Sequence, residues 1–218
     1  MMPRQVPPLL DDFALAGSPV VANNAMNRER GLLGVNSYER EAGLDPLSRL
    51  TGGDAWLDLC CGSGRALFEA AADPRARGVT ITGVDLVDFF VPAVRPPGLE
   101  LVVADVSAWR PSRLYDLITC VHGLHYVGDR LGLLARAASW LTPSGLLVAD
   151  FDPGQVTGAG GLVGELRRHG FGYDARARRI TLRGGREVVF PYRYLGADDT
   201  AGPNYTGQPA VRAYYTHT

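Results

Sequence analysis

Between residues 55 and 152, short apolar segments alternate with segments of helical character. Apolar or β-branched runs lie at 56–60, 78–86, 99–106, 115–121 and 145–151, and the helical stretches between them lie at 65–72, 88–94 and 129–141. Continuous apolar runs are typical of strands buried on both faces, and intervening helices allow such strands to run parallel. The pattern predicts an α/β fold, a mostly parallel sheet with helices on both faces.

The pattern changes after residue 152. LVGELRRHG, from Leu162, predicts another helix, and the runs 177–183 and 186–196 flank Gly184-Gly185, a signal for an antiparallel hairpin. The stretch 197–218 is polar and rich in turn residues but contains tyrosines, so it is either disordered or folded back over a site or a neighbouring subunit. We expect a seven-stranded, mostly parallel sheet with a C-terminal antiparallel hairpin strand.

Charge gives no reason to expect a polyanionic partner. The chain has 22 basic and 23 acidic residues and a formal net charge of −1, which argues against nucleic acid or an acidic membrane surface. Every basic residue is Arg, which excludes Schiff-base lysine chemistry and a Walker-type lysine. The N-terminus, MMPRQVPPLLDDF, has no secretory pattern, so we expect a cytoplasmic protein with no membrane segment.

The cysteines are few. Cys60, Cys61 and Cys120 form an odd set without the spacing of a disulfide framework. No Cys-x-x-Cys or His-x-x-x-His spacing accompanies them, so the sequence predicts no metal site. We expect small buried thiols.

The turn Gly62-Ser63-Gly64 joins the first expected strand to the first helix, where backbone can approach a ligand closely. Asp85 and Asp105 end the next two strands, at the edge where parallel sheets bind ligands, and a carboxylate at the second strand end can hold ribose hydroxyls. A nicotinamide fingerprint would need Gly at position 67, where the chain has Leu67. The carboxylate of Asp58, just before the turn, suits a ligand that presents an amine there better than one that presents a pyrophosphate.

These motifs resemble those of the class I S-adenosylmethionine-dependent methyltransferases over about residues 54–152. DLCCGSG (58–64) is similar to the first motif, acid-x-Gly-x-Gly-x-Gly, with Cys60 at the first Gly. The second and third motifs are matched by GVD (83–85) and ADV (104–106), and later motifs by 115–126 and 141–145.

The resemblance implies S-adenosylmethionine as cofactor and S-adenosylhomocysteine as its product. Gly62 and Gly64 would line the methionine portion, Asp85 would bind the ribose, and Asp105 with Val106 would meet the adenine. Asp58 would order the loop or hold the amine through water. Cys60, Leu86 and Val121 complete the expected cofactor-binding set within the core. Relatives often close an N-terminal helix over the cofactor, and 26–41 is the candidate here, with Tyr38 and Arg28 as contacts.

A base is expected beyond the fourth strand. His122 and His125 lie in CVHGLHYVGD (120–129), three residues apart, and imidazole suits deprotonation of a hydroxyl or ammonium group. Both are candidate catalytic residues, although residues here often only pack or contact the cofactor. Asp150 and Asp152 could orient an amine, and Tyr192 and Tyr194 could line an aromatic pocket.

We expect one domain over 1–218. It comprises an N-terminal helical lid (1–50), a cofactor-binding core (54–152), a substrate-side helix and hairpin (153–196) and a tail (197–218). The expected function is methyl transfer to O or N of a small molecule, such as a secondary metabolite, by a monomer or homodimer. The alternatives are a non-methylating S-adenosylmethionine-binding cyclase, isomerase or regulator, and a nicotinamide oxidoreductase.

Overall fold

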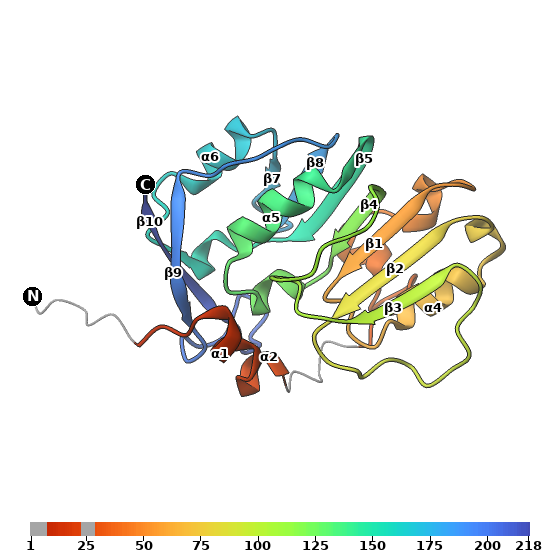
Figure 1. Cartoon of the computed structure of the whole chain (residues 1–218), viewed down its shortest axis with the longest axis horizontal. Coiled ribbons are helices and arrows are strands. Elements are labelled where there is room, and N and C mark those ends of the chain that lie inside the picture. Colours follow the sequence, from red (N-terminus) through yellow and green to blue (C-terminus); the bar gives the residue numbers. More distant parts are fainter. Residues whose placement is uncertain (1–7, 23–28) are drawn as a thin grey trace, which may run out of the picture.

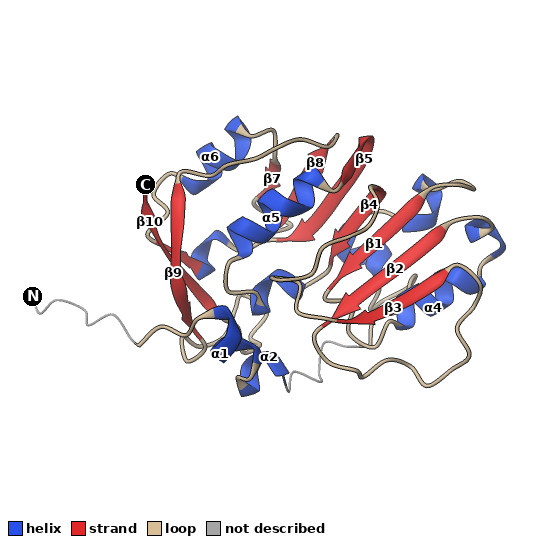
Figure 2. Cartoon of the chain, in the orientation of Figure 1, coloured by secondary structure: helices blue, strands red, loops and turns tan. Residues whose placement is uncertain are grey.

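The computed structural model describes residues 8–22 and 29–218, and in this part of the chain the main sheet has seven strands in the order β3-β2-β1-β4-β5-β8-β7 (Figures 1 and 2). Its strands are β1 (Ala55–Leu59), β2 (Thr80–Asp85), β3 (Leu99–Val103), β4 (Tyr115–Cys120), β5 (Leu141–Asp150), β7 (Gly172–Asp174) and β8 (Arg179–Arg183). The pairs among β1–β5 are parallel, whereas β8 is antiparallel to both β5 and β7. The expected fold class is therefore confirmed.

Strand β1 lies inside this sheet, between β2 and β4, and all of its residues are buried. Its one charged residue, Asp58, is paired with the hydroxyls of Tyr38 and Thr119. Leu57 and Leu59 pack with helix α5 (Arg130–Ser139) on one face, and Trp56 packs with helix α4 (Arg65–Ala72) on the other. This alternation is the two-residue period of a strand, and it gives the sheet one core on each face.

The carboxyl ends of β1, β2, β4 and β5 meet along one edge. Three short segments cover that edge: α1 (Asp12–Ala16), α2 (Pro19–Ala22) and α3 (Tyr38–Ala42). Helix α1 approaches it by way of strand β9 (Tyr192–Asp198), to which Leu10 is joined by two backbone hydrogen bonds with Ala197 of 2.8 and 2.9 Å. Figure 1 shows α1 and α2 below this edge.

The expected helix over 26–41 is largely wrong within the described residues. Residues 29–37 are non-helical, with Gly34 at a φ of +102°, and only α3 is helical, capped by the Ser37 side chain. Arg28 lies outside the described residues.

A second sheet, not expected from the sequence, has the order β6-β10-β9 within the described residues. It contains β6 (Val156–Thr157), β9 and β10 (Arg212–His217), the last being part of the polar C-terminal stretch. Tyr215 in β10 is buried in the main core and donates to Asp129, while Val211 donates its N–H to the carbonyl of His125. The C-terminal stretch is therefore folded back onto the protein rather than disordered.

The hairpin expected at Gly184-Gly185 is wrong. Strand β8 pairs with β5 and β7, while the following glycines donate to the carbonyls of Gly145 and Thr142. These two hydrogen bonds attach the chain to the start of β5 instead of turning it into a hairpin. The next strand, β9, therefore joins the second sheet. Helix α6 (Leu162–Arg168), in contrast, forms where it is expected.

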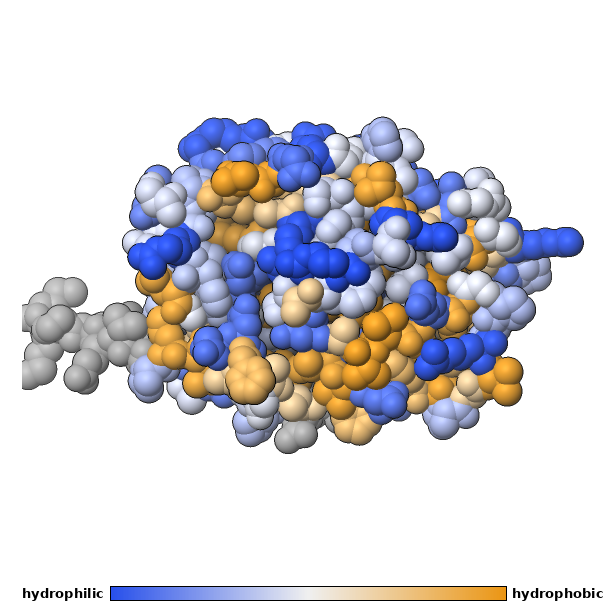
Figure 3. Space-filling model, viewed as in Figure 1, coloured by the Kyte–Doolittle hydropathy of each residue, from blue (hydrophilic) through white to orange (hydrophobic). Residues whose placement is uncertain are grey.

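The helix expected over 88–94 is also wrong, because that part of the chain is irregular. Pro92 within it lacks an N–H, and Pro96-Pro97 follow. Exposed apolar residues of this loop and of β3 are Phe89, Val94 and Val103. Figure 3 shows the largest group of apolar residues in the lower part of this face, with smaller groups elsewhere and hydrophilic residues spread between them. In the described part of the chain, every helix is too short or too polar to span a bilayer.

Candidate functional site

The loop after β1 turns sharply through three left-handed residues. Cys60, Gly62 and Gly64 have φ values of +58°, +61° and +70°. Only glycine adopts this conformation without strain, which explains the glycines of the motif and makes Cys60 a strained substitute for the first of them. Gly64 lies behind the loop, where an added Cβ would approach the Leu101 methyls at 3.3 Å.

A hollow opens between this loop, the ends of β2 and β4 and the N-terminal helices. The space within it, including the open solvent at its mouth, is about 790 Å³. It is lined by Asp12, Leu15, Ala16, Val21, Cys60, Gly62, Asp85, Leu86, Asp105, Val106, Ser107, Val121, His122, Gly123, Tyr126, Val127 and Gly128. Seven of the ten expected cofactor residues are among them.

The carboxylates that line the hollow give it a negative charge. Asp12, Asp85 and Asp105 line it, and none of the described lining residues is Arg. Burial raises the pKa of Asp12, with Asp129 and Asp105 adding to the effect. Such a lining attracts a cationic ligand such as a sulfonium and repels a pyrophosphate, which disfavours a nicotinamide cofactor.

Asp85 is fixed by the loop that it faces. Its Oδ2 accepts the Gly62 N–H at 2.8 Å, and its Oδ1 accepts the Val87 N–H at 3.2 Å. The carboxylate therefore orders the glycine turn as well as lining the hollow.

Asp58 lies below the hollow and is fully buried. It accepts hydrogen bonds from the hydroxyls of Tyr38, at 2.6 Å, and Thr119, at 2.5 Å. Thr119 in turn accepts from the Trp56 indole at 2.8 Å. These two partners belong to α3 and β4 and not to the glycine turn, so both roles considered for Asp58 stay predictions. Tyr38, expected to contact the cofactor, is likewise buried against Asp58.

We expect the unfolding free energy to show the titration of Asp58. Burial raises its pKa from 3.8 to about 7, so between these values the folded state keeps a proton that the unfolded state has lost. Stability relative to an Asp58→Asn variant should therefore fall as the pH rises from about 4 to 7 and then level off. Urea unfolding of both proteins at several pH values measures this difference. The exposed Asp88→Asn is the control, and a pH-independent difference for Asp58→Asn would contradict the assignment.

The cysteines are not reactive thiols. A hydrogen bond to Cys120, together with burial, raises the pKa of Cys60, and burial raises that of Cys61. Both thiols therefore stay protonated at neutral pH and pack as small apolar groups.

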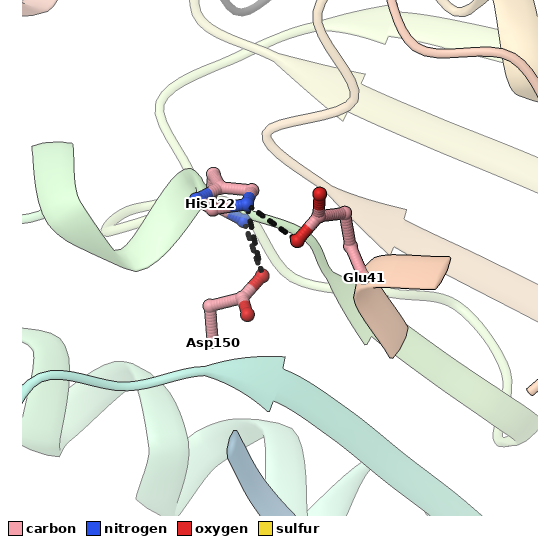
Figure 4. A group of neighbouring side chains, drawn as sticks. All are labelled: Glu41, His122 and Asp150. Atoms are coloured by element: carbon pink, nitrogen blue, oxygen red, sulfur yellow. Dashed lines mark hydrogen bonds and ion pairs between the residues drawn. The ribbon is translucent and has the colours of Figure 1, made fainter. Parts of the chain in front are cut away.

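His122 stands at one wall of the hollow with a φ of +58°. Its Nε2 lies 3.1 Å from Glu41 Oε2 of α3 and 3.9 Å from Asp150 Oδ2 at the end of β5 (Figure 4). Asp150 Oδ2 also accepts the backbone N–H of His122 at 2.9 Å. The hydrogen bond to His122 lowers the pKa of Glu41, whereas burial raises that of Asp150.

His125 lies behind this wall and does not line the hollow. Its ring is 1% exposed, and neither of its nitrogens has a hydrogen-bond partner among the described residues. It packs 5.8 Å from the His122 ring and 5.5 Å from that of Tyr205, centroid to centroid. The Arg178 guanidinium lies 4.6 Å from the centre of the Tyr205 ring and pairs with Asp152 at 2.5 Å. Burial lowers the pKa of His125 to about 3, so its imidazole is neutral.

Sequence reasoning missed two acidic residues at this site, Asp12 and Glu41, which come from the N-terminal segment. Tyr205, which packs on His125, is one of the tail tyrosines that were expected either to be disordered or to fold back over a site. Of the other aromatic candidates, Tyr192 donates to the Gly160 carbonyl and Tyr194 packs on Tyr215, both in the second sheet.

Residues 35–179 match the family described as a methyltransferase domain. Trans-aconitate 2-methyltransferase of Paracidovorax citrulli (strain AAC00-1) is 33% identical over 95 residues, which are 42% of this chain and 36% of that protein. The same enzyme of Acidovorax sp. (strain JS42) is 32% identical over 96 residues, 42% of this chain and 35% of that protein. The chain thus matches about a third of the length of these relatives.

The fold is shared with a solved structure. The [4+2]-cyclase SpnF has a TM-score of 0.51 and 17% identity, over 76% of this chain and 74% of its own. Coclaurine N-methyltransferase, solved with N-methylheliamine and SAH, has a TM-score of 0.40 and 23% identity, over 51% of this chain and 33% of its own. With the match over 35–179, the motif order and the acid-lined hollow, the chain belongs to the class I S-adenosylmethionine-dependent methyltransferases.

Proposed function

We propose that this methyltransferase transfers the methyl group to an oxygen or nitrogen of a small molecule, of the secondary-metabolite kind. The observation that carries the proposal is the acid-lined hollow, which ends at the imidazole of His122. The named substrate of the curated relatives is also a small molecule, which supports a small acceptor.

The residues of the hollow fit the cofactor. Its sulfonium supplies an activated methyl group and a positive charge, which the carboxylates of Asp12, Asp85 and Asp105 complement. The peptide N–H of Gly62 donates a hydrogen bond to the carboxylate of Asp85, so the glycine turn is preorganised for ligand binding. Methyl transfer is an in-line displacement, and much of its catalysis is alignment of the two reacting groups.

His122 is the residue that we propose to act on the acceptor atom, because it borders the hollow and has two carboxylates beside it. His125 supports it from behind rather than contacting the cofactor. We propose a cytoplasmic protein acting as a monomer or homodimer, in keeping with its free cysteines.

Titration calorimetry with S-adenosylhomocysteine and NAD tests the cofactor, and transfer of labelled methyl to a panel of small hydroxyl and amine compounds tests the acceptor. We expect binding of the sulfur ligand, no binding of NAD, and label in at least one O- or N-methyl product. Binding of NAD alone would overturn the proposal, as would label found only on carbon or on macromolecules.

A further inference from the structure

Three side chains that commonly bind metals converge beside the hollow: Glu41, His122 and Asp150 (Figure 4). They come from α3, from the turn after β4 and from the end of β5, and one ligand atom of each lies within 4.8 Å of the other two. Metal–ligand bonds of about 2.0–2.2 Å place neighbouring ligand atoms roughly 3–3.5 Å apart. The 3.1 Å from His122 Nε2 to Glu41 matches that spacing, and the 3.9 Å to Asp150 is longer, so the side chains would close in on a bound ion.

We propose that Glu41, His122 and Asp150 bind a divalent transition-metal cation next to the methyl donor. Only the chemical role given to the cation rests on the proposed function; the binding site itself does not.

The charges of the cluster favour a cation. Two carboxylates face one imidazole nitrogen, which can donate a hydrogen bond to only one of them at a time. A protonated ring would carry one positive charge against the two carboxylates, of which Asp150 is 3% exposed, and the guanidinium groups of Arg30, Arg40 and Arg179 add positive charge nearby. Arg178 forms an ion pair with Asp152, and Arg179 donates hydrogen bonds to the backbone carbonyl of Glu41 instead of its carboxylate.

The three groups are also held in place. Tyr38, one turn before Glu41 on the same short helix, is bound to Asp58, and Arg179 holds the Glu41 carbonyl at 2.8 Å. Asp150 is oriented by the His122 N–H. Ligands fixed by such outer contacts are typical of metal sites. The Glu41 side chain is 31% exposed, so the cluster is accessible from solvent.

His125 is an independent observation pointing to a ligand here. Its ring is almost fully buried, both nitrogens lack partners among the described residues, and it packs against the His122 ring. A buried polar group without a partner is costly, so a ligand or an ordered water beside the two histidine rings would stabilise His125.

The donor set selects the kind of ion. One imidazole with two carboxylates suits Mn²⁺, Fe²⁺, Co²⁺ or Zn²⁺ better than the all-oxygen preference of Mg²⁺ or Ca²⁺. At such an ion the hydroxyl of an acceptor loses its proton to solvent more readily. The resulting oxygen attacks the donor methyl: the O–C bond forms, the C–S bond breaks, and the sulfur keeps the electron pair as a neutral thioether. His122 then acts as a ligand and not as the base itself.

Titration of the chelator-treated protein with Co²⁺, followed by visible absorption and calorimetry, tests the site. We expect one equivalent to bind. Glu41→Gln and Asp150→Asn should each weaken binding by more than about tenfold, since even outer-shell partners of metal ligands contribute 10- to 100-fold. Glu39→Gln, on the exposed side of the same helix, is the matched control and should bind Co²⁺ like the wild type.

Absence of stoichiometric Co²⁺ binding, or binding that survives both substitutions, would overturn the site. Calorimetry with S-adenosylhomocysteine on the same samples separates this outcome from failure of the proposed function. If the protein binds the sulfur ligand but not Co²⁺, the proposed cation site is wrong and the proposed function stands. If it binds Co²⁺ but not the sulfur ligand, the proposed methyl transfer is wrong and the cation site stands. Thermal unfolding of each variant checks that the substituted proteins are folded.

Discussion

Replacing His122 by Asn should lower turnover by about 10²- to 10⁴-fold, the usual contribution of acid–base catalysis, whether the imidazole takes the acceptor's proton itself or holds the cation at which that proton is lost. The imidazole borders the hollow and lies against Glu41 and Asp150, so it is the group best placed to act on the acceptor. Asn is chosen because position 122 has a φ of +58°, a conformation that Asn adopts more readily than Ala does. Cofactor affinity should change by only a few fold. Turnover with the acceptor found by the labelling screen and calorimetry with S-adenosylhomocysteine measure the two quantities.

His169→Asn is the matched control, because His169 also pairs with a glutamate, Glu165 at 3.2 Å, but lies at a separate surface hollow. Its turnover should equal that of the wild type. Full turnover in the His122 variant would mean that alignment alone drives the reaction, and a parallel loss of cofactor affinity would make His122 a binding residue.

Replacing Asp85 by Ala should weaken cofactor binding by about 1–3 kcal/mol, or roughly 5- to 150-fold in Kd. The variant loses a carboxylate of the acid-lined hollow and also the acceptor for the Gly62 and Val87 N–H groups. The turn is then no longer held in the shape that admits a ligand. Calorimetry with S-adenosylhomocysteine measures the affinity without turnover.

Asp88→Asn, three residues further along the same loop and exposed, is the control and should bind normally. Unchanged affinity in Asp85→Ala would remove Asp85 from the cofactor site. An Asp85→Asn variant separates the two causes, since it keeps an acceptor oxygen for the turn but removes the charge. If charge is the larger contribution, Asn and Ala should weaken binding to a similar extent.

The two halves of the site are connected through α3. The Trp56–Thr119–Asp58–Tyr38 chain of hydrogen bonds runs from the centre of the sheet to the helix that presents Glu41. The burial of Asp58 below the hollow and the placement of Glu41 beside His122 thus depend on the same Tyr38–Asp58 contact. Tyr38 therefore helps to position α3 through its hydrogen bond to Asp58, a role that does not require contact with the cofactor.

Much of the cofactor site could be predicted because it depends on local order along the chain. Gly62, Asp85 and Asp105 follow three parallel strands, and parallel strands bring their carboxyl ends to one edge whatever else surrounds them. The same reasoning predicted that Gly64 and Tyr38 contact the ligand, whereas the structure does not place them among the residues that line the hollow. Motif order identifies which loop forms the site, but packing decides which side of the loop each residue faces.

The sequence by itself determined the α/β class, the succession of strands and the acidic residues at their ends, since hydrophobic period and turn chemistry act over a few residues. Only the tertiary structure decided which distant segments meet at that edge. Glu41 and His122 are 81 residues apart, and the Tyr205 ring reaches His125 from the tail. No spacing rule links such positions, so the cluster of Glu41, His122 and Asp150 exists only because the sheet packs α3 against the end of β5.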